Sequence, residues 1–316
     1  MLKTTALSLT LLAFVVQPGF AHAQTQAKTP TQAQSQMPAF DTAPIEKATG
    51  MKGTLNQKEN VYKVSKPRPN MNASINGWKI PPFMGIGSWA AFTPAGNGQV
   101  MVMGDNVLFE DEVAATMRAA LDNGLEVTAL HNHFFYEQPR VFFMHISGMG
   151  DPAALGAAVK KVLDTPDGIR AGHATPATTY ALKPVPSESH ITGAPLEAIM
   201  GSKGEANNGM FKVTLGRETK MHGMTMGNAM GVNTWAGFAG TDDQAVVDGD
   251  FAVLEDELQP VLKSLTKSGI DVVAIHQHMT NEVPRIMFLH YWGQGKAQDL
   301  AKAIHTAVDL TATKVP

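Results

Sequence analysis

The stretch HNHFFYEQPRVFFMH at residues 131–145 recurs later in the chain as HQHMTNEVPRIMFLH at residues 276–290. The second copy follows the first at a constant shift of 145 residues, without a gap, from Gln99 to His145. Over this range 17 of 47 positions are identical, which is far more than chance produces. Self-similarity at this length predicts two tandem copies of one module.

The repeat extends outward from this stretch in both directions. Ala43-Pro44-Ile45-Glu46 recurs as Ala194-Pro195-Leu196-Glu197, and MGIGSWAAF at 84–92 recurs as MGVNTWAGF at 230–238. We therefore expect a first module at 43–170, a linker rich in Thr, Pro and Ser at 171–193, and a second module at 194–312. By analogy with isologous dimers, two modules of one kind are expected to pack about a pseudo-twofold axis.

The local pattern within each module predicts alternating helices and strands. Acidic residues open the segment 110–123 and Asn123-Gly124 closes it, as in a helix with its usual start and stop signals. Two segments rich in β-branched and aromatic residues flank Pro139 and indicate strands that meet at a turn. The elements expected in the first module are helices from Pro44, at 110–123 and at 152–163, and strands near 61–64, 99–103, 125–133 and 141–146. A β-α-β-β-α core predicts the α+β class, with a mostly antiparallel sheet and helices packed on one face.

The first residues have the pattern of a secretory signal peptide, expected at 1–23. Lys3 gives a positive start, an apolar run follows at 5–16, and Ala21-His22-Ala23 forms a cleavage site. Residues 24–42 are rich in Gln, Thr, Ala and Pro, which predicts a disordered tether. We expect a periplasmic protein with no membrane anchor in its mature form.

Composition narrows the classes of partner and of metal ligand. A hydrophobic content of 44% with 17% charged residues is typical of a folded soluble protein. The net charge of −3 argues against nucleic acid as a partner, since binding it needs clustered Lys and Arg. The chain has no cysteine, so any metal must be held by His, carboxylate or Met.

Six of the eleven histidines fall in the two repeated stretches. Residues i and i+2 of a strand point to one face, so His131 and His133 are expected side by side. A hairpin centred on Pro139 would place His145 opposite His133. Such a group suits a divalent metal, namely zinc, or else copper, nickel, iron or manganese. The predicted metal ligands are His131, His133, His145, His276, His278 and His290.

Charged residues that both copies retain lie close to the histidines in the sequence. Glu137 and Glu282 are candidates for a metal ligand or general base. Arg140 and Arg285 are candidates for a clamp on a small anionic ligand. Structural alternatives are that the histidines bond to carbonyl or carboxylate groups and that each arginine pairs with the nearby glutamate. The sequence leaves these alternatives open.

Two further features admit a binding or a structural interpretation. The segment MHGMTMGNAM at 221–230 holds four Met and one His, which suits Cu(I), although methionine also fills irregular cores. Trp89 and Trp235, with Phe92 and Phe238, suit either stacking on a ligand or core packing.

The motifs MGIGSWAAF, ALHNHFFYEQPR and VFFMHISGMGDP, with their second copies AIHQHM and EVPRIMFLHYWG, resemble the LppY/LpqO family of bacterial envelope proteins. The resemblance covers about 43–312. It implies export and a tandem module of unknown function, and it carries over no catalytic residues. The actinobacterial members are lipoproteins, whereas this chain lacks the cysteine for a lipid anchor.

Three functions fit these observations. The leading hypothesis is a module that binds a divalent metal and, if it is an enzyme, acts as a metal-dependent hydrolase. The second is a non-catalytic carrier of copper or another metal. The third is a metal-free module in which the histidines are structural and an envelope component, such as a peptide, glycan or protein, is bound.

Overall fold

The computed structural model describes residues 40–312, except 181 and 183. The expected signal peptide at 1–23 and residues 24–39 of the expected tether lie outside the described residues. Within the described part of the chain, no helix combines the length and the apolar character needed to cross a membrane.

The first module contains three α-helices and a set of mostly long strands. The expected helices are present, although the last one continues to Gly172. The elements are α1 (Ala43–Thr49), β1 (Thr54–Asn56), β2 (Val61–Pro67), β3 (Ser74–Ile75), β4 (Trp78–Lys79), β5 (Gly87–Gly96), β6 (Gln99–Phe109), α2 (Val113–Asp122), β7 (Glu126–His131), β8 (Val141–Gly150) and α3 (Pro152–Gly172).

The second module repeats this order almost element for element. Its elements are α4 (Gly193–Met200), β9 (Gly204–Asn207), β10 (Met210–Gly216), β11 (Thr219–Met221), β12 (Met224–Met226), β13 (Asn233–Gly240), β14 (Ala245–Leu254), α5 (Glu255–Lys267), β15 (Asp271–His276), β16 (Glu282–Val283), β17 (Ile286–Gly295) and α6 (Ala297–Val308). The predicted α+β class with a mostly antiparallel sheet is confirmed.

The main strands of both modules form one sheet of 12 strands. Their order is β1-β2-β5-β6-β8-β7-β15-β17-β14-β13-β10-β9, which is palindromic when each strand is equated with its counterpart. The modules meet where β7 pairs with β15, at Leu130 and Ile275. A palindromic order with equivalent strands at its centre is the arrangement that a pseudo-twofold axis produces.

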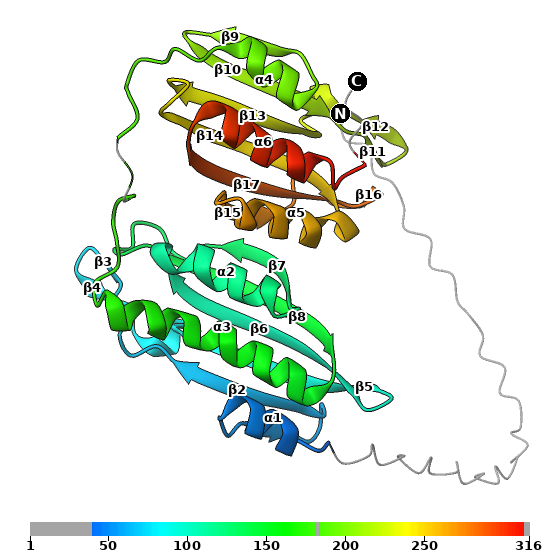
Figure 1. Ribbon diagram of the computed structural model, residues 1–316. Helices are drawn as coiled ribbons and strands as arrows, with labels where there is room; N and C mark the ends of the chain where they lie inside the picture. Colours follow the sequence, from blue (N-terminus) through cyan, green and yellow to red (C-terminus); the bar gives the residue numbers. More distant parts are fainter. Residues whose placement is uncertain (1–39, 181, 183, 313–316) are drawn as a thin grey trace, which may run out of the picture. The chain divides into compact units, whose positions relative to one another are not determined.

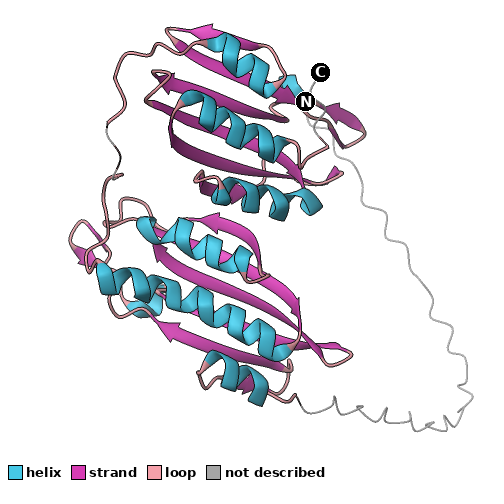
Figure 2. Cartoon of the chain, in the orientation of Figure 1, coloured by secondary structure: helices cyan, strands magenta, loops and turns pink. Residues whose placement is uncertain are grey.

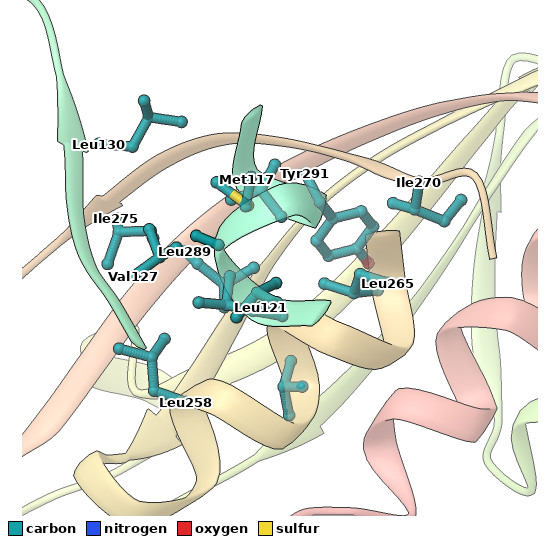
Figure 3. Close-up of a cluster of buried hydrophobic side chains, with 14 of the residues drawn as sticks. Met117, Leu121, Val127, Leu130, Leu258, Leu265, Ile270, Ile275, Leu289 and Tyr291 are labelled. Carbon is teal, nitrogen blue, oxygen red and sulfur yellow. The ribbon is translucent and has the colours of Figure 1, made fainter. Parts of the chain in front are cut away.

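The helices of each module lie over one face of its strands (Figures 1 and 2). The main core lies between these layers and takes residues from both modules, including the junction residues Leu130 and Ile275 (Figure 3). Because successive strand residues alternate between faces, the neighbours of these core residues point to the other side of the sheet.

Smaller cores cover part of the face away from the helices. In the first module Phe143 and Val107 pack there with residues around the β3–β4 hairpin. In the second module Phe288 and Ile286 pack with Met226. The small cores border the histidine clusters, because Phe143 contacts His133 and Phe288 contacts His278.

A buried ion pair joins the start of the second helix to the sheet in each module. Nη2 of Arg68 donates to both oxygens of Glu112, at 2.8 and 2.9 Å, and Arg217 donates from Nη1 and Nη2 to one oxygen each of Glu257. The glutamates also accept the backbone N–H groups of Phe109 and Leu254. Glu112 and Glu257 therefore have a structural role.

The sequence prediction omitted strands β5 and β13. Their inward residues Ala90, Phe92, Ala236 and Phe238 are fully buried, while Trp89 and Trp235 lie on the opposite face beneath Lys63 and Lys212. Alanine and glycine have weak strand propensity, so these strands carry little local signal. Tertiary pairing on both sides stabilises them.

Candidate metal centre

The six predicted histidines lie on, or just after, the four strands in the middle of the sheet. His131 closes β7 and His145 lies on β8, while His276 closes β15 and His290 lies on β17. His133 and His278 begin the loops that follow β7 and β15. The structure thus brings the three histidines of each copy together.

The register differs from the expected one. His145 pairs with Ala129 and His131 pairs with Phe143, so His145 is not opposite His133. His290 pairs with Ala274 in the same way. The expectation of a hairpin centred on Pro139 was wrong.

The loop between the two strands sets this register, and a bulge lies just beyond the histidine pairs. A bulge interrupts β7 between Val127 and Ala129, and another interrupts β15 between Val272 and Ala274. The loop from β7 to β8 is also long, and Gln138 in it exchanges two backbone hydrogen bonds of 2.9 Å with Ser74 of the β3–β4 hairpin. His131 and His145 become diagonal neighbours on one face, a separation that imidazoles can span.

In the first cluster the imidazoles converge directly. The Nε2 atoms of His131 and His145 are 3.0 Å apart. The ring of His133 stacks on Phe143 with centroids 3.4 Å apart, and it lies 5.1 Å from the ring of His131. Phe143 belongs to the small core, so packing fixes the orientation of His133.

The second cluster has the geometry of a metal site. The ligand atoms of His276, His278 and His290 all lie within 4.8 Å of one another, and within the described residues they form the one such group of three. His278 stacks on Phe288 at 3.5 Å, as His133 does on Phe143. Nδ1 of His290 lies 3.4 Å from the carbonyl oxygen of Gly249, and donation to that oxygen leaves Nε2 as the free ligand atom.

An aspartate on the adjacent strand completes each cluster, and the sequence analysis missed it. Asp105 on β6 pairs with His145, and Asp250 on β14 pairs with His290. Asp250 lies 3.6 Å from Nε2 of His278 and 3.9 Å from Nδ1 of His290. Asp250 is buried and Asp105 is half-buried, and the buried Oδ1 atom of each has no hydrogen-bond partner among the described residues.

A signal for these aspartates was present in the repeat. Asp105 and Asp250 occupy equivalent positions at the shift of 145 residues. Each sits inside an apolar strand, where an unpaired carboxylate is costly. A carboxylate that both copies retain at such a position needs a partner, and a bound cation is one.

Burial tunes the protonation of both clusters toward metal binding. It lowers the pKa of His276 and of His278, and the neighbouring His290 lowers both pKa values further. In the first cluster, burial and the adjacent His131 lower the pKa of His133. Neutral imidazoles expose a lone pair, which is the form that binds metals.

The two aspartates shift in the opposite direction. Burial raises the pKa of Asp250 to about 6, although His290 acts to lower it. Burial also raises the pKa of Asp105, against the influence of His145. A cation placed among these groups would favour the ionised carboxylates and offset their desolvation.

The two predicted catalytic glutamates are placed at the base of the loops. Glu137 is 1% exposed and accepts the N–H of Val141 at 3.3 Å, and Glu282 accepts the N–H of Ile286 at 3.2 Å. These contacts hold the loops that carry His133 and His278. A catalytic role for Glu137 and Glu282 stays a prediction.

The two predicted anion-binding arginines are about half exposed. Arg140 lies 4.0 Å from Glu137, and Arg285 lies 3.8 Å from Glu255. The Arg285–Glu255 pair lies at the surface, where such pairs contribute little stability, and Arg140 contacts its buried partner only at the outer limit of an ion pair. Their guanidinium groups therefore keep donors available to a ligand.

The methionine-rich segment 221–230 runs from the end of β11 through β12 to a short 3-10 helix at Asn228–Met230. Met226 is buried and Met221 packs against the same small core, while Met224 and Met230 are exposed. Two of the four methionines in this segment, Met221 and Met226, therefore contribute to packing. The first module has a corresponding hairpin, β3–β4, without methionine in its strands.

Comparison with known proteins identifies the family of the two modules. The model of the family described as Domain of Unknown Function (DUF1259) matches residues 43–165 and 194–310. The two segments correspond to the two copies of the repeat and together cover more than half of the chain. Comparisons with curated proteins and with solved structures gave no match. This protein therefore belongs to the DUF1259 family, with two copies of the family domain in tandem.

Proposed function

We propose that this protein binds a divalent transition-metal ion in each module, through three histidines and one aspartate. The proposed ligands are His131, His133, His145 and Asp105 in the first module, and His276, His278, His290 and Asp250 in the second. The observation that carries the proposal is the convergence of three imidazoles, within 4.8 Å, beside a buried carboxylate oxygen that lacks a partner.

The donor set supports a transition metal rather than calcium or magnesium. Imidazole nitrogen with one carboxylate oxygen suits zinc, copper, nickel or iron, whereas calcium and magnesium prefer oxygen ligands. The buried Nδ1 of His276 and Oδ1 of Asp250 lack partners among the described residues. Polar atoms left this way in a protein interior favour a ligand that satisfies them.

The chain itself contributes orientation and charge to the proposed site. Stacking on Phe143 and Phe288 holds His133 and His278, and the Gly249 carbonyl selects the tautomer of His290. A divalent ion held there would polarise a substrate oxygen or activate water, which is the chemistry of a metal-dependent hydrolase. Arg140 and Arg285, half exposed and next to the loops, are suited to bind an anionic substrate group.

Export to the periplasm is part of the proposal. It rests on the signal-peptide pattern at 1–23 and on the resemblance to the LppY/LpqO envelope proteins.

A second candidate function is the binding of an organic ligand next to the second cluster. A hollow of about 390 Å³ on the open face of the second module is lined by Trp235, Trp292, Lys212 and Asp248 among others. Trp292 lies two residues after His290, and its buried Nε1 has no hydrogen-bond partner among the described residues. A ring-shaped ligand with an acceptor group fits this hollow, either alone or as the substrate of the neighbouring cluster.

Metal titration of the purified, metal-free protein tests the leading proposal. Calorimetry with zinc should give one ion per module in the wild type. The double variants His131→Ala/His133→Ala and His276→Ala/His278→Ala should each lose one ion. The matched control is His173→Ala, an exposed histidine outside both clusters. Equal binding by the control and both double variants would rule out the clusters as the site.

A further inference from the structure

We propose that the first module carries a second, different metal site, a thioether site for a soft monovalent cation such as Cu(I) or Ag(I). Its ligands are Met101 and Met103 of β6 and Met149 of β8. This site is separate from the histidine cluster and does not depend on it.

The register brings the three methionines together on the open face of the sheet. Met101 and Met149 are direct partners across β6 and β8, and Met103 is two residues from Met101. Direct partners have Cβ atoms about 5 Å apart, and residues two apart on a strand are separated by about 7 Å. Methionine has three rotatable bonds, so three sulfur atoms can converge on one ion from these positions.

The three side chains are exposed and have room to move. Their exposed fractions are 45% for Met101, 56% for Met103 and 63% for Met149. Their partners on the neighbouring strand are small, with Thr93 beside Met101 and Ala91 beside Met103. The thioethers therefore add little to the core, and burial does not explain their presence.

The second module provides an internal comparison at the same rungs of the sheet. Its residues at the shift of 145 are Val246, Asp248 and Gln294. The same ladder forms with these residues, since Val246 pairs with Gln294 and Asp248 pairs with Trp292. The methionines are consequently not required by the architecture.

The chemistry of the donors selects the ion. Thioether sulfur is a soft ligand that favours Cu(I), whereas imidazole and carboxylate favour divalent ions. With no cysteine in the chain, a cluster of methionines is the softest donor set available. The rung Met103–Ser147 lies between the Met101–Met149 pair and the Asp105–His145 pair. Along β6 and β8, this face of the sheet therefore carries sulfur donors first and, two pairs further on, nitrogen and oxygen donors.

Nuclear magnetic resonance of the full protein labelled at its methionine methyl groups tests this site, with Ag(I) as the redox-inert probe. The methyl signals of Met101, Met103 and Met149 should shift together and saturate at one equivalent. Met84 and Met210, which are exposed but lie outside the proposed site, are controls within the same spectrum. Met224 and Met230 report on any binding at the β11–β12 hairpin.

The triple variant Met101→Leu/Met103→Leu/Met149→Leu separates thioether binding from loss of fold. Leucine has nearly the volume of methionine, so the variant should melt within a few degrees of the wild type. It should bind Ag(I) at least tenfold more weakly, and its zinc binding should be unchanged. Equal Ag(I) affinity in the variant would overturn the proposal. So would methyl shifts of the three methionines no larger than those of Met84 and Met210.

Discussion

At the scale of single residues, Asp250 has opposite effects on stability and on the proposed metal binding. Its carboxylate is 4% exposed, and its Oδ1 has no hydrogen-bond partner among the described residues. Without a cation, an ionised carboxylate in this position is unfavourable. When a cation is bound beside it, the same carboxylate serves as a ligand, and folding has already removed the water around it.

Substitution Asp250→Asn should therefore stabilise the metal-free protein and weaken metal binding. Burial raises the pKa of Asp250 to about 6, so the folded state holds a proton that the unfolded state releases near pH 4. The contribution of Asp250 to stability should therefore fall as the pH rises from about 4 to about 6, and the stability advantage of the Asn variant over the wild type should grow across this range. At pH 7 the gain should be roughly 1–3 kcal/mol, with metal affinity at least tenfold lower.

Urea unfolding of the metal-free proteins across this pH range measures the change in stability, and zinc titration measures the change in metal affinity. An Asn variant that is less stable at pH 7 and binds zinc like the wild type would assign Asp250 a purely structural role.

The sequence identified the histidines at this scale but not the aspartates. Histidines in an H-x-H pattern are conspicuous because they are rare and clustered. Asp105 lies among Val, Met, Gly and Asn on β6, more than twenty residues before the histidines, and only the sheet pairing brings it beside His145. The local sequence pattern does not predict the pairing of β6 with β8.

At the scale of elements, the bulges in β7 and β15 and the loops that follow them decide the shape of each cluster. The loops are closed by buried glutamates whose carboxylates accept backbone N–H groups of the next strand. This contact fixes the start of β8 and β17 and so the positions of His145 and His290.

Substitution Glu282→Ala should destabilise the second module by about 1–3 kcal/mol, because the N–H of Ile286 loses its buried acceptor. Glu282→Gln keeps an acceptor oxygen and should cost less. Thermal unfolding measures both effects. If Glu282 holds the loop and is not a ligand, the Gln variant should bind zinc within about threefold of the wild type. A tenfold loss of zinc affinity in the Gln variant would indicate that Glu282 is a metal ligand.

The elements themselves were largely predictable from sequence, whereas their register was not. Acidic residues at the start of α2 and Gly124 after it marked that helix accurately. The bulges carry no sequence signal comparable to a glycine or proline, since Thr128 and Val273 are ordinary strand residues. The loop at 132–140 closes on the pair His131–Phe143, and the bulge lies beyond Ala129, so it is the loop that makes a hairpin drawn from Pro139 alone give the wrong partner for His145.

At the scale of the whole molecule, the two modules share one sheet through a short junction. Leu130 pairs with Ile275, and beyond this pair β7 and β15 diverge. The side chain of Gln259 on α5 takes the place of the missing ladder, since it accepts from the N–H of Val127 at 2.9 Å and donates to its carbonyl at 3.0 Å. The corresponding residue of the first module is Ala114, so this bridge breaks the symmetry.

Substitution Gln259→Ala should remove both hydrogen bonds and leave the backbone of Val127 unpaired. The expected loss is on the order of 1–3 kcal/mol. Hydrogen exchange should become faster at the Val127 amide, while amides in α1 and α4 should be little affected. Gln99→Ala, at an exposed hairpin position, is the matched control. Unchanged protection of Val127 would mean that the junction is held without Gln259.

The tandem organisation was the part of the whole molecule most accessible from sequence, because a gapless repeat is visible without any structural knowledge. The continuous sheet was not accessible. It depends on one pairing between β7 and β15 and on a glutamine present in only one copy.

The metal content of the tag-free protein, purified from the periplasm without added metal, tests the central claim most directly. Mass spectrometry of the elements should find a transition metal at one equivalent per module. The content should fall by half in His133→Ala or in His278→Ala and stay unchanged in His173→Ala. Metal at background level in the wild type, with no thermal stabilisation by zinc, copper, nickel, iron or manganese, would contradict the claim and leave the histidines structural.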